Sequence, residues 1–190
     1  MRYDFLIDTY ETERIKVVST WSMFMDADLP VRPHPTDPRG RSFHEHMVHQ
    51  CVSEDLWMRN MLGVAASLPA LPKQETRQAF IDHYGRASGE RVDLLADKAD
   101  EWYDEHTTFF DVTRSRAWVL TRRFTHSAHH RGQLMVYLRL WGHAVYSTYG
   151  PTADTGGLFQ NGARVIYSGA GDQQFPVATD KPVTERPDNT

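Results

Sequence analysis

The chain has 190 residues, of which 40% are hydrophobic and 24% charged, so it is long enough to bury a sizeable core in one domain. Its formal net charge of −4 and its pI of about 6.2 give no support for binding to nucleic acid or to a membrane through a basic surface. The single cysteine, Cys51, excludes an internal disulfide and a cysteine-based zinc cluster.

The first residues carry carboxylates at Asp4 and Asp8, where a signal peptide needs an unbroken apolar region. No apolar run approaches the roughly 18 residues that span a bilayer. We therefore expect a cytoplasmic protein with no membrane partner and no nucleic-acid partner.

Four long segments have the apolar periodicity of helices and predict an all-α four-helix bundle. Their expected ranges are 4–25, 42–66, 75–99 and, from a start between 113 and 116, to 142. Ser42 and Glu45 fit a capping box at the start of the second helix, in which each side chain satisfies a free backbone donor. Gly142 is expected to cap the last helix.

The connections between the helices also have a clear composition. Residues 29–40 contain four prolines and cannot continue a helix, and residues 102–110 form an aromatic-rich link. Beyond Gly142 the chain is rich in glycine and proline, which predicts a loop-rich C-terminal extension with one strand-like run at 163–167. We expect one domain over 1–175 and a disordered tail over 176–190.

Two histidines in the fourth helix have the spacing of a metal site. His126 and His130 are four residues apart, so both lie on one helical face, which also carries Leu134 and Tyr137. A helical wheel of the second helix places His49 on its expected inward face, together with Val52, Leu56 and Asn60. Three histidines would leave a coordination position open, as catalytic metal sites require.

The histidines also allow other interpretations. A lone buried histidine is more often a hydrogen-bonded core residue than a metal ligand. A zincin motif needs Glu directly after the first histidine, and Ser127 stands there instead. A carboxylate-bridged di-iron bundle needs Glu-x-x-His, which the sequence lacks.

Three further side chains are candidates for a substrate pocket or for support of the metal ligands. Arg123 shares the direction of the histidines and could bind an anionic substrate, although an arginine near a helix end more commonly reaches solvent. Tyr137 could donate a hydrogen bond to a substrate, although a satisfied core tyrosine is commoner. Gln133 could hold the free nitrogen of His130. Gly132, in mid-helix, predicts a close helix contact. No catalytic residue is assigned.

Three features together resemble the DinB family. They are the His-x-x-x-His-His-Arg-Gly-Gln string at 126–133, His49 five residues before Glu54 with Trp57 following, and the segment 149–157. The resemblance extends from about the first helix to Gly157. It implies a metal-binding four-helix bundle that is typically a homodimer, with its three-histidine metal site at His49, His126 and His130.

The resemblance also implies a class of chemistry. The wider superfamily includes transferases and isomerases in which a divalent ion activates a low-molecular-weight thiol such as bacillithiol, mycothiol or glutathione. We therefore expect a metal-dependent S-transferase that acts on a small electrophile, with Zn or Ni favoured as the ion and Mn or Fe as alternatives. A hydrolase that uses metal-bound water and a non-catalytic stress-associated metal-binding protein stay open.

Overall fold

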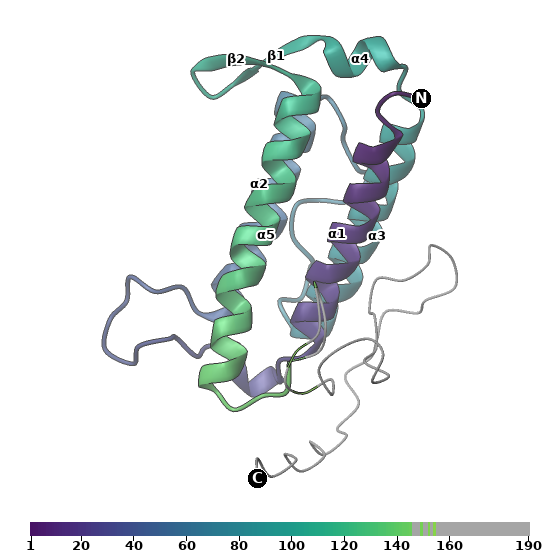
Figure 1. The fold of residues 1–190 in the computed structure, drawn as a ribbon. Coiled ribbons are helices and arrows are strands. Elements are labelled where there is room, and N and C mark those ends of the chain that lie inside the picture. Colours follow the sequence, from purple (N-terminus) through teal and green to yellow (C-terminus); the bar gives the residue numbers. More distant parts are fainter. Residues whose placement is uncertain (146–148, 150–151, 153, 155–190) are drawn as a thin grey trace.

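The computed structural model describes residues 1–145, 149, 152 and 154 (Figure 1). Four long helices form a bundle, which confirms the predicted fold class. They are α1 (Asp4–Ser22), α2 (Phe43–Leu56), α3 (Arg77–Ala96) and α5 (Arg116–Leu140). Helix α1 packs against α3 and α5, and α2 packs against α5 (Figure 1).

Five short elements complete the described part of the chain: η1 (Asp26–Asp28), η2 (Trp57–Met61), α4 (Asp100–Asp104), β1 (His106–Phe109) and β2 (Val112–Ser115). Strands β1 and β2 pair antiparallel as a hairpin at the end of the bundle where α5 begins (Figure 1). The sequence suggested only an aromatic-rich link here. The hairpin was missed because its strands are short and face mostly solvent, so they lack the apolar alternation that signals a strand.

The helix ends follow the predicted capping signals. The Ser42 hydroxyl accepts from the Glu45 N–H at 3.2 Å, and the Glu45 carboxylate accepts from the Ser42 N–H at 2.8 Å. Gly142 has φ +78°, a left-handed conformation that suits glycine at a helix C-terminus. The second helix ends earlier than predicted, because it passes into the π-helical turn η2 and stops before Gly63.

The predicted inward face of α2 was wrong. Val52, Leu56 and Asn60 are exposed, and His49 is half-buried at the edge of the interior. The buried face instead carries Phe43, His46, Met47, Gln50, Cys51, Ser53 and Glu54. A wheel that treats polar residues as solvent-facing cannot find this face, because much of it consists of polar groups. Cys51 is a buried residue of the core.

Several expectations lie outside the described residues. They concern the strand-like run at 163–167, the tail at 176–190 and most of the segment 149–157. Within the described part of the chain, no helix is both long and apolar enough to cross a membrane.

A buried carboxylate, Glu54, joins the four long helices. Its side chain is 0% exposed and accepts hydrogen bonds from the hydroxyls of Tyr10 on α1 and Tyr84 on α3, at 2.6 and 2.7 Å. It also forms ion pairs with Arg91 on α3 and Arg123 on α5, each at 3.3 Å. Burial alone would raise the pKa of Glu54, but the charges of Arg123 and Arg91 outweigh it, so the pKa is lowered. Glu54 is therefore ionised and fully paired.

This network joins two apolar clusters into one interior. One cluster contains Tyr84 with Trp21 and Phe43, and the other contains Tyr10 with Trp57 and other side chains. Because the tyrosine hydroxyls meet on the same carboxylate, the positions of the two clusters depend on Glu54.

We predict that Glu54→Gln lowers the free energy of unfolding by about 3–5 kcal/mol, because it leaves two buried guanidinium groups facing an uncharged amide. Urea unfolding followed by circular dichroism measures the change. Asp93→Asn, at an exposed position of α3, is the matched control and should stay within about 0.5 kcal/mol of the wild type. Equal stability of the two variants would contradict the structural role of Glu54.

Candidate metal centre

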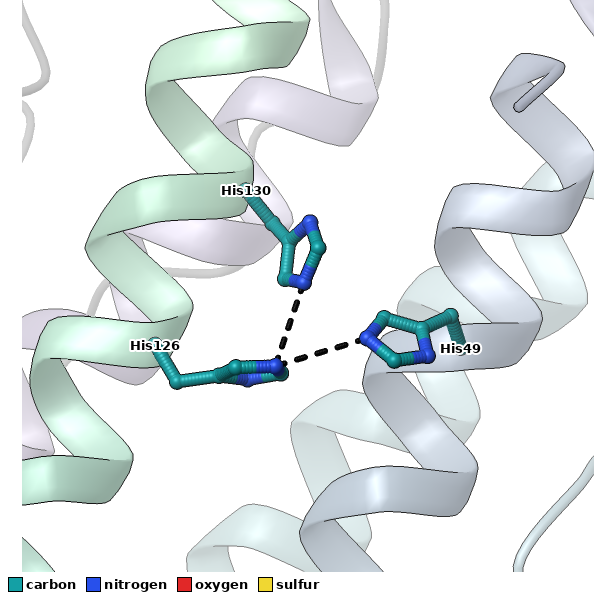
Figure 2. A group of neighbouring side chains, drawn as sticks. All are labelled: His49, His126 and His130. Carbon is teal, nitrogen blue, oxygen red and sulfur yellow. Dashed lines mark hydrogen bonds between the residues drawn. The ribbon is translucent and has the colours of Figure 1, made fainter. Parts of the chain in front are cut away.

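Three imidazoles from two helices point toward one another (Figure 2). His49 lies on α2, and His126 and His130 lie one turn apart on α5. The Nε2 atom of His126 is 3.2 Å from Nε2 of His130 and 3.4 Å from Nε2 of His49. The nitrogen atoms that could bind an ion all lie within 4.8 Å of one another. These are the three histidines that the sequence predicted.

The neighbours of His126 and His130 fix the tautomers of these two imidazoles. Nδ1 of His130 donates to Oε1 of Gln133 at 2.9 Å, which leaves the Nε2 lone pair facing the centre. Nδ1 of His126 accepts from Nη1 of Arg123 at 3.1 Å, so its proton is on Nε2. The Nε2–H of His126 then donates to Nε2 of His130. The three rings thus form one hydrogen-bonded group.

The group is neutral at neutral pH, as metal binding requires. Burial, followed by the charge of Arg123, lowers the pKa of His126 to about 3. Burial also lowers the pKa of His130 to about 4, and burial with the charge of Arg41 lowers that of His49. The imidazoles therefore fit a divalent ion in spacing and chemistry. To bind an ion through Nε2 as a neutral imidazole, His126 would carry its proton on Nδ1 and give up the hydrogen bond from Arg123.

Aromatic residues cover the His126 side of the centre. The Trp57 ring lies 5.3 Å from that of His126, and the hairpin places Phe109 and Phe110 at 5.0 and 6.1 Å from Trp57. Phe110 is 62% exposed and adopts φ +53°, which is uncommon for a bulky residue. The sequence alone does not connect these aromatics with the histidines, because the hairpin that places them has no clear strand pattern.

His46 and Tyr137 lie on the opposite side of the centre. The His46 ring is 5.5 Å from that of His130 and 5.4 Å from that of Tyr137. His46 is 2% exposed, and its Nδ1 has no hydrogen-bond partner among the described residues. The sequence did not predict this position of His46, because it depends on contacts with residues of another helix.

The other predicted site residues have different surroundings. Arg123 is 0% exposed, so it does not reach solvent; its partners are Glu54, Ser53, Ser127 and His126, one of the three histidines. Gln133 bonds His130, whereas Tyr137 is half-buried beside His46. Gly132 makes no close helix contact, because it is exposed and a Cβ there would meet nothing within 4 Å.

Comparisons with known proteins identify the family and support the fold. A model of the DinB family matches residues 28–158, which is more than half of the chain. The chain belongs to the DinB family. Among solved structures, a DinB-like protein from Bacillus cereus ATCC 10987 superposes with a TM-score of 0.62 at 21% identity, over 74% of this chain and 92% of that one. The DinB-like protein YjoA from Bacillus subtilis gives 0.57 at 17% identity, over 74% and 94%. A comparison with curated proteins finds no match.

In this DinB protein, His46 should make the metal-free form sensitive to acid. Burial, with the charges of His130 and Arg41, lowers the pKa of His46 to about 3, whereas an unfolded histidine titrates near 6.5. Below about pH 6.5 His46 becomes protonated in the unfolded chain, whereas in the folded chain it stays neutral down to about pH 3. The stability that the neutral, buried His46 contributes is thus fully present above pH 6.5, and it is lost as the pH falls from 6.5 toward 3.

The free energy of unfolding should fall less steeply with decreasing pH in His46→Gln. We predict a slope smaller by about 1.4 kcal/mol per pH unit, which corresponds to one proton. Urea unfolding of EDTA-treated protein between pH 6 and 4.5 measures the slope. His34→Gln, at an exposed position, should keep the wild-type slope. An unchanged slope in His46→Gln would show that His46 does not cause the acid sensitivity.

Proposed function

We propose that the protein binds a divalent metal ion through His49, His126 and His130 and is a metal-dependent S-transferase that joins a low-molecular-weight thiol to a small electrophile. The observation that supports this most is the convergence of three neutral imidazoles from two helices. A divalent ion supplies acidity when bound, because it lowers the pKa of a coordinated thiol toward neutral pH. Zn and Ni are the favoured ions, ahead of Mn and Fe.

The residues around the imidazoles support an ordered centre. Gln133 holds the ring of His130 through its far nitrogen, as partners of metal-binding histidines usually do. Arg123, which is fixed by Ser53, Ser127 and Glu54, donates a hydrogen bond to Nδ1 of His126 and so orients this ring in the metal-free protein. The Trp57 ring lies beside that of His126 on the hairpin side. The helices thus orient the ligands before any ion binds.

The lack of a nearby base favours a thiol over water as the nucleophile. No carboxylate within the described part of the chain is hydrogen-bonded to the three imidazoles. Glu54 is enclosed by Tyr10, Tyr84 and two arginines, and Glu45 is held by Ser42 and Arg32. A thiol has a much lower pKa than water, so it needs less help to lose its proton. The S-transferase is therefore better supported than the hydrolase.

Metal content tests the centre directly. His130→Ala should lose stoichiometric Zn or Ni, measured by mass spectrometry after dialysis, because two imidazoles cannot hold the ion tightly. Gln133→Ala should weaken binding by about 10–100-fold, the usual effect of removing a partner of a ligating histidine. His129→Ala is the matched control and should bind as the wild type does, because His129 is exposed and outside the group of three. Unchanged metal content in His130→Ala would show that the ligands are wrong.

Turnover tests the chemistry. We expect Zn- or Ni-loaded protein to conjugate monochlorobimane with at least one of bacillithiol, mycothiol and glutathione, and to lose this activity in His130→Ala. Turnover of an ester or amide without thiol would favour the hydrolase. Stable metal binding with no turnover of several electrophiles and all three thiols would favour the non-catalytic protein. The homodimer and the cytoplasmic location expected from the sequence stay predictions.

A further inference from the structure

The two imidazoles of α5 have partners of opposite kinds. The amide oxygen of Gln133 accepts from Nδ1–H of His130 at 2.9 Å. Arg123 precedes His126 by three residues, and its Nη1 donates to Nδ1 of His126 at 3.1 Å. An amide can accept or donate a hydrogen bond, whereas a guanidinium can only donate. His130 therefore carries its proton on Nδ1, and His126 carries its proton on Nε2.

Only one of these tautomers suits an ion between the imidazoles. A metal-binding histidine directs a bare nitrogen at the ion and donates from its other nitrogen to an acceptor. His130 already has this arrangement with Gln133. In His126 the nitrogen that faces the other rings carries the proton, and the far nitrogen meets a donor (Figure 2). When Nε2 of His126 binds an ion, its contact with Arg123 becomes one between two donors.

The guanidinium of Arg123 is anchored in the core. Besides His126, its Nη1 contacts the hydroxyl of Ser53, to which it donates at 2.9 Å. Its Nη2 donates to the hydroxyl of Ser127 and forms the ion pair with Glu54, each at 3.3 Å. The side chain is also fully buried, so water cannot replace a lost partner. Moving Arg123 away from His126 would break contacts of the network around Glu54.

The imidazole of His126 is held as well. The buried ring of Trp57 lies 5.3 Å from that of His126, with an angle of 36° between the planes. The guanidinium carbon of Arg123 lies 5.6 Å from the centre of the same Trp57 ring. Arg123, His126 and Trp57 thus pack as a group. Turning the imidazole away from Arg123 would disturb this packing, so neither side can avoid the conflict without cost.

We propose that Arg123 and the divalent ion compete for His126, so that Arg123 limits how tightly the centre holds its ion. On ion binding, the imidazole releases its Nε2 proton to solvent, takes one up at Nδ1 and stays neutral, and the hydrogen bond from Nη1 of Arg123 breaks. This rests on the proposed function and deepens it, because it names a residue that regulates the same centre. Occupancy of the centre is thereby coupled to the network around Glu54.

The tautomers of the wild type test the first step without any change to the core. Protein labelled with ¹⁵N-histidine is studied by long-range proton–nitrogen correlation NMR, which distinguishes bare, protonated and metal-bound ring nitrogens. His126→Asn identifies the signals of His126. We expect the proton on Nε2 in EDTA-treated protein and on Nδ1 after zinc is added. A proton on Nδ1 before zinc is added, or none on Nδ1 afterwards, would overturn the proposal.

Zinc affinity tests the competition itself. Arg123→Gln places an amide beside His126, and an amide can accept from Nδ1–H as Gln133 does for His130. We expect this variant to bind zinc about tenfold more tightly than the wild type, because ion binding no longer breaks a charge-assisted hydrogen bond. Competition with the chelating dye zincon gives each Kd.

Arg91→Gln is the matched control for the disturbed core. Arg91 also pairs with Glu54 at 3.3 Å, but no hydrogen bond or ion pair within the described part of the chain joins it to the three histidines. Arg91→Gln should therefore not tighten zinc binding. Zincon competition with this variant thus separates the contact with His126 from a general loosening of the core.

The possible outcomes separate this proposal from the proposed function. If zinc binds the wild type and Arg123→Gln equally, or if Arg91→Gln gains as much affinity, the role of Arg123 is overturned while the metal centre stands. If zinc binds neither the wild type nor Arg123→Gln, the proposed function itself has failed. If Arg123→Gln does not fold, the tautomers of the wild type decide.

Discussion

The ionised carboxylate of Glu54 is the constraint on which the rest of the structure depends. A buried charge is tolerated only when its partners compensate for the lost water, and here they come from every other long helix of the bundle. Moving any one helix would leave a charge or a hydroxyl unpaired. The apolar clusters hold the helices together, and Glu54 specifies their relative positions.

The same network extends from the core to the candidate metal centre. Arg123 contacts Glu54 with one guanidinium nitrogen and Nδ1 of His126 with the other, so the orientation of one imidazole depends on the packing of the bundle. His130 depends on Gln133, one turn further along α5. No described side chain bonds Nδ1 of His49. Two imidazoles are thus fixed by α5 and its partners, and the third can adjust from α2 to the ion it meets.

Local signals explain what the sequence could predict. Ser42 and Glu45 determine a helix start, Gly142 a helix end, and the spacing of His126 and His130 a shared face, because each depends only on residues within a few positions. Glu54 and Arg123 were not predicted to be buried, because a charged residue is buried only when its partner, distant in sequence, is buried with it. His46 was missed because its position depends on ring contacts with His130 and Tyr137 on another helix. The hairpin was missed because its strands have no clear apolar pattern. It is held in place by a tertiary contact of Phe109 with Trp57.

The hairpin and the long helices differ in how much sequence change they tolerate. Within β1 and β2 only Phe109 is buried, so most of the hairpin can vary in sequence or length without disturbing the bundle. The imidazoles, in contrast, are on long helices whose positions are tied to the core. Selection can therefore remodel the aromatic surface beside the centre while the three histidines stay in place. In this architecture, new substrates can evolve on the hairpin at little cost to folding.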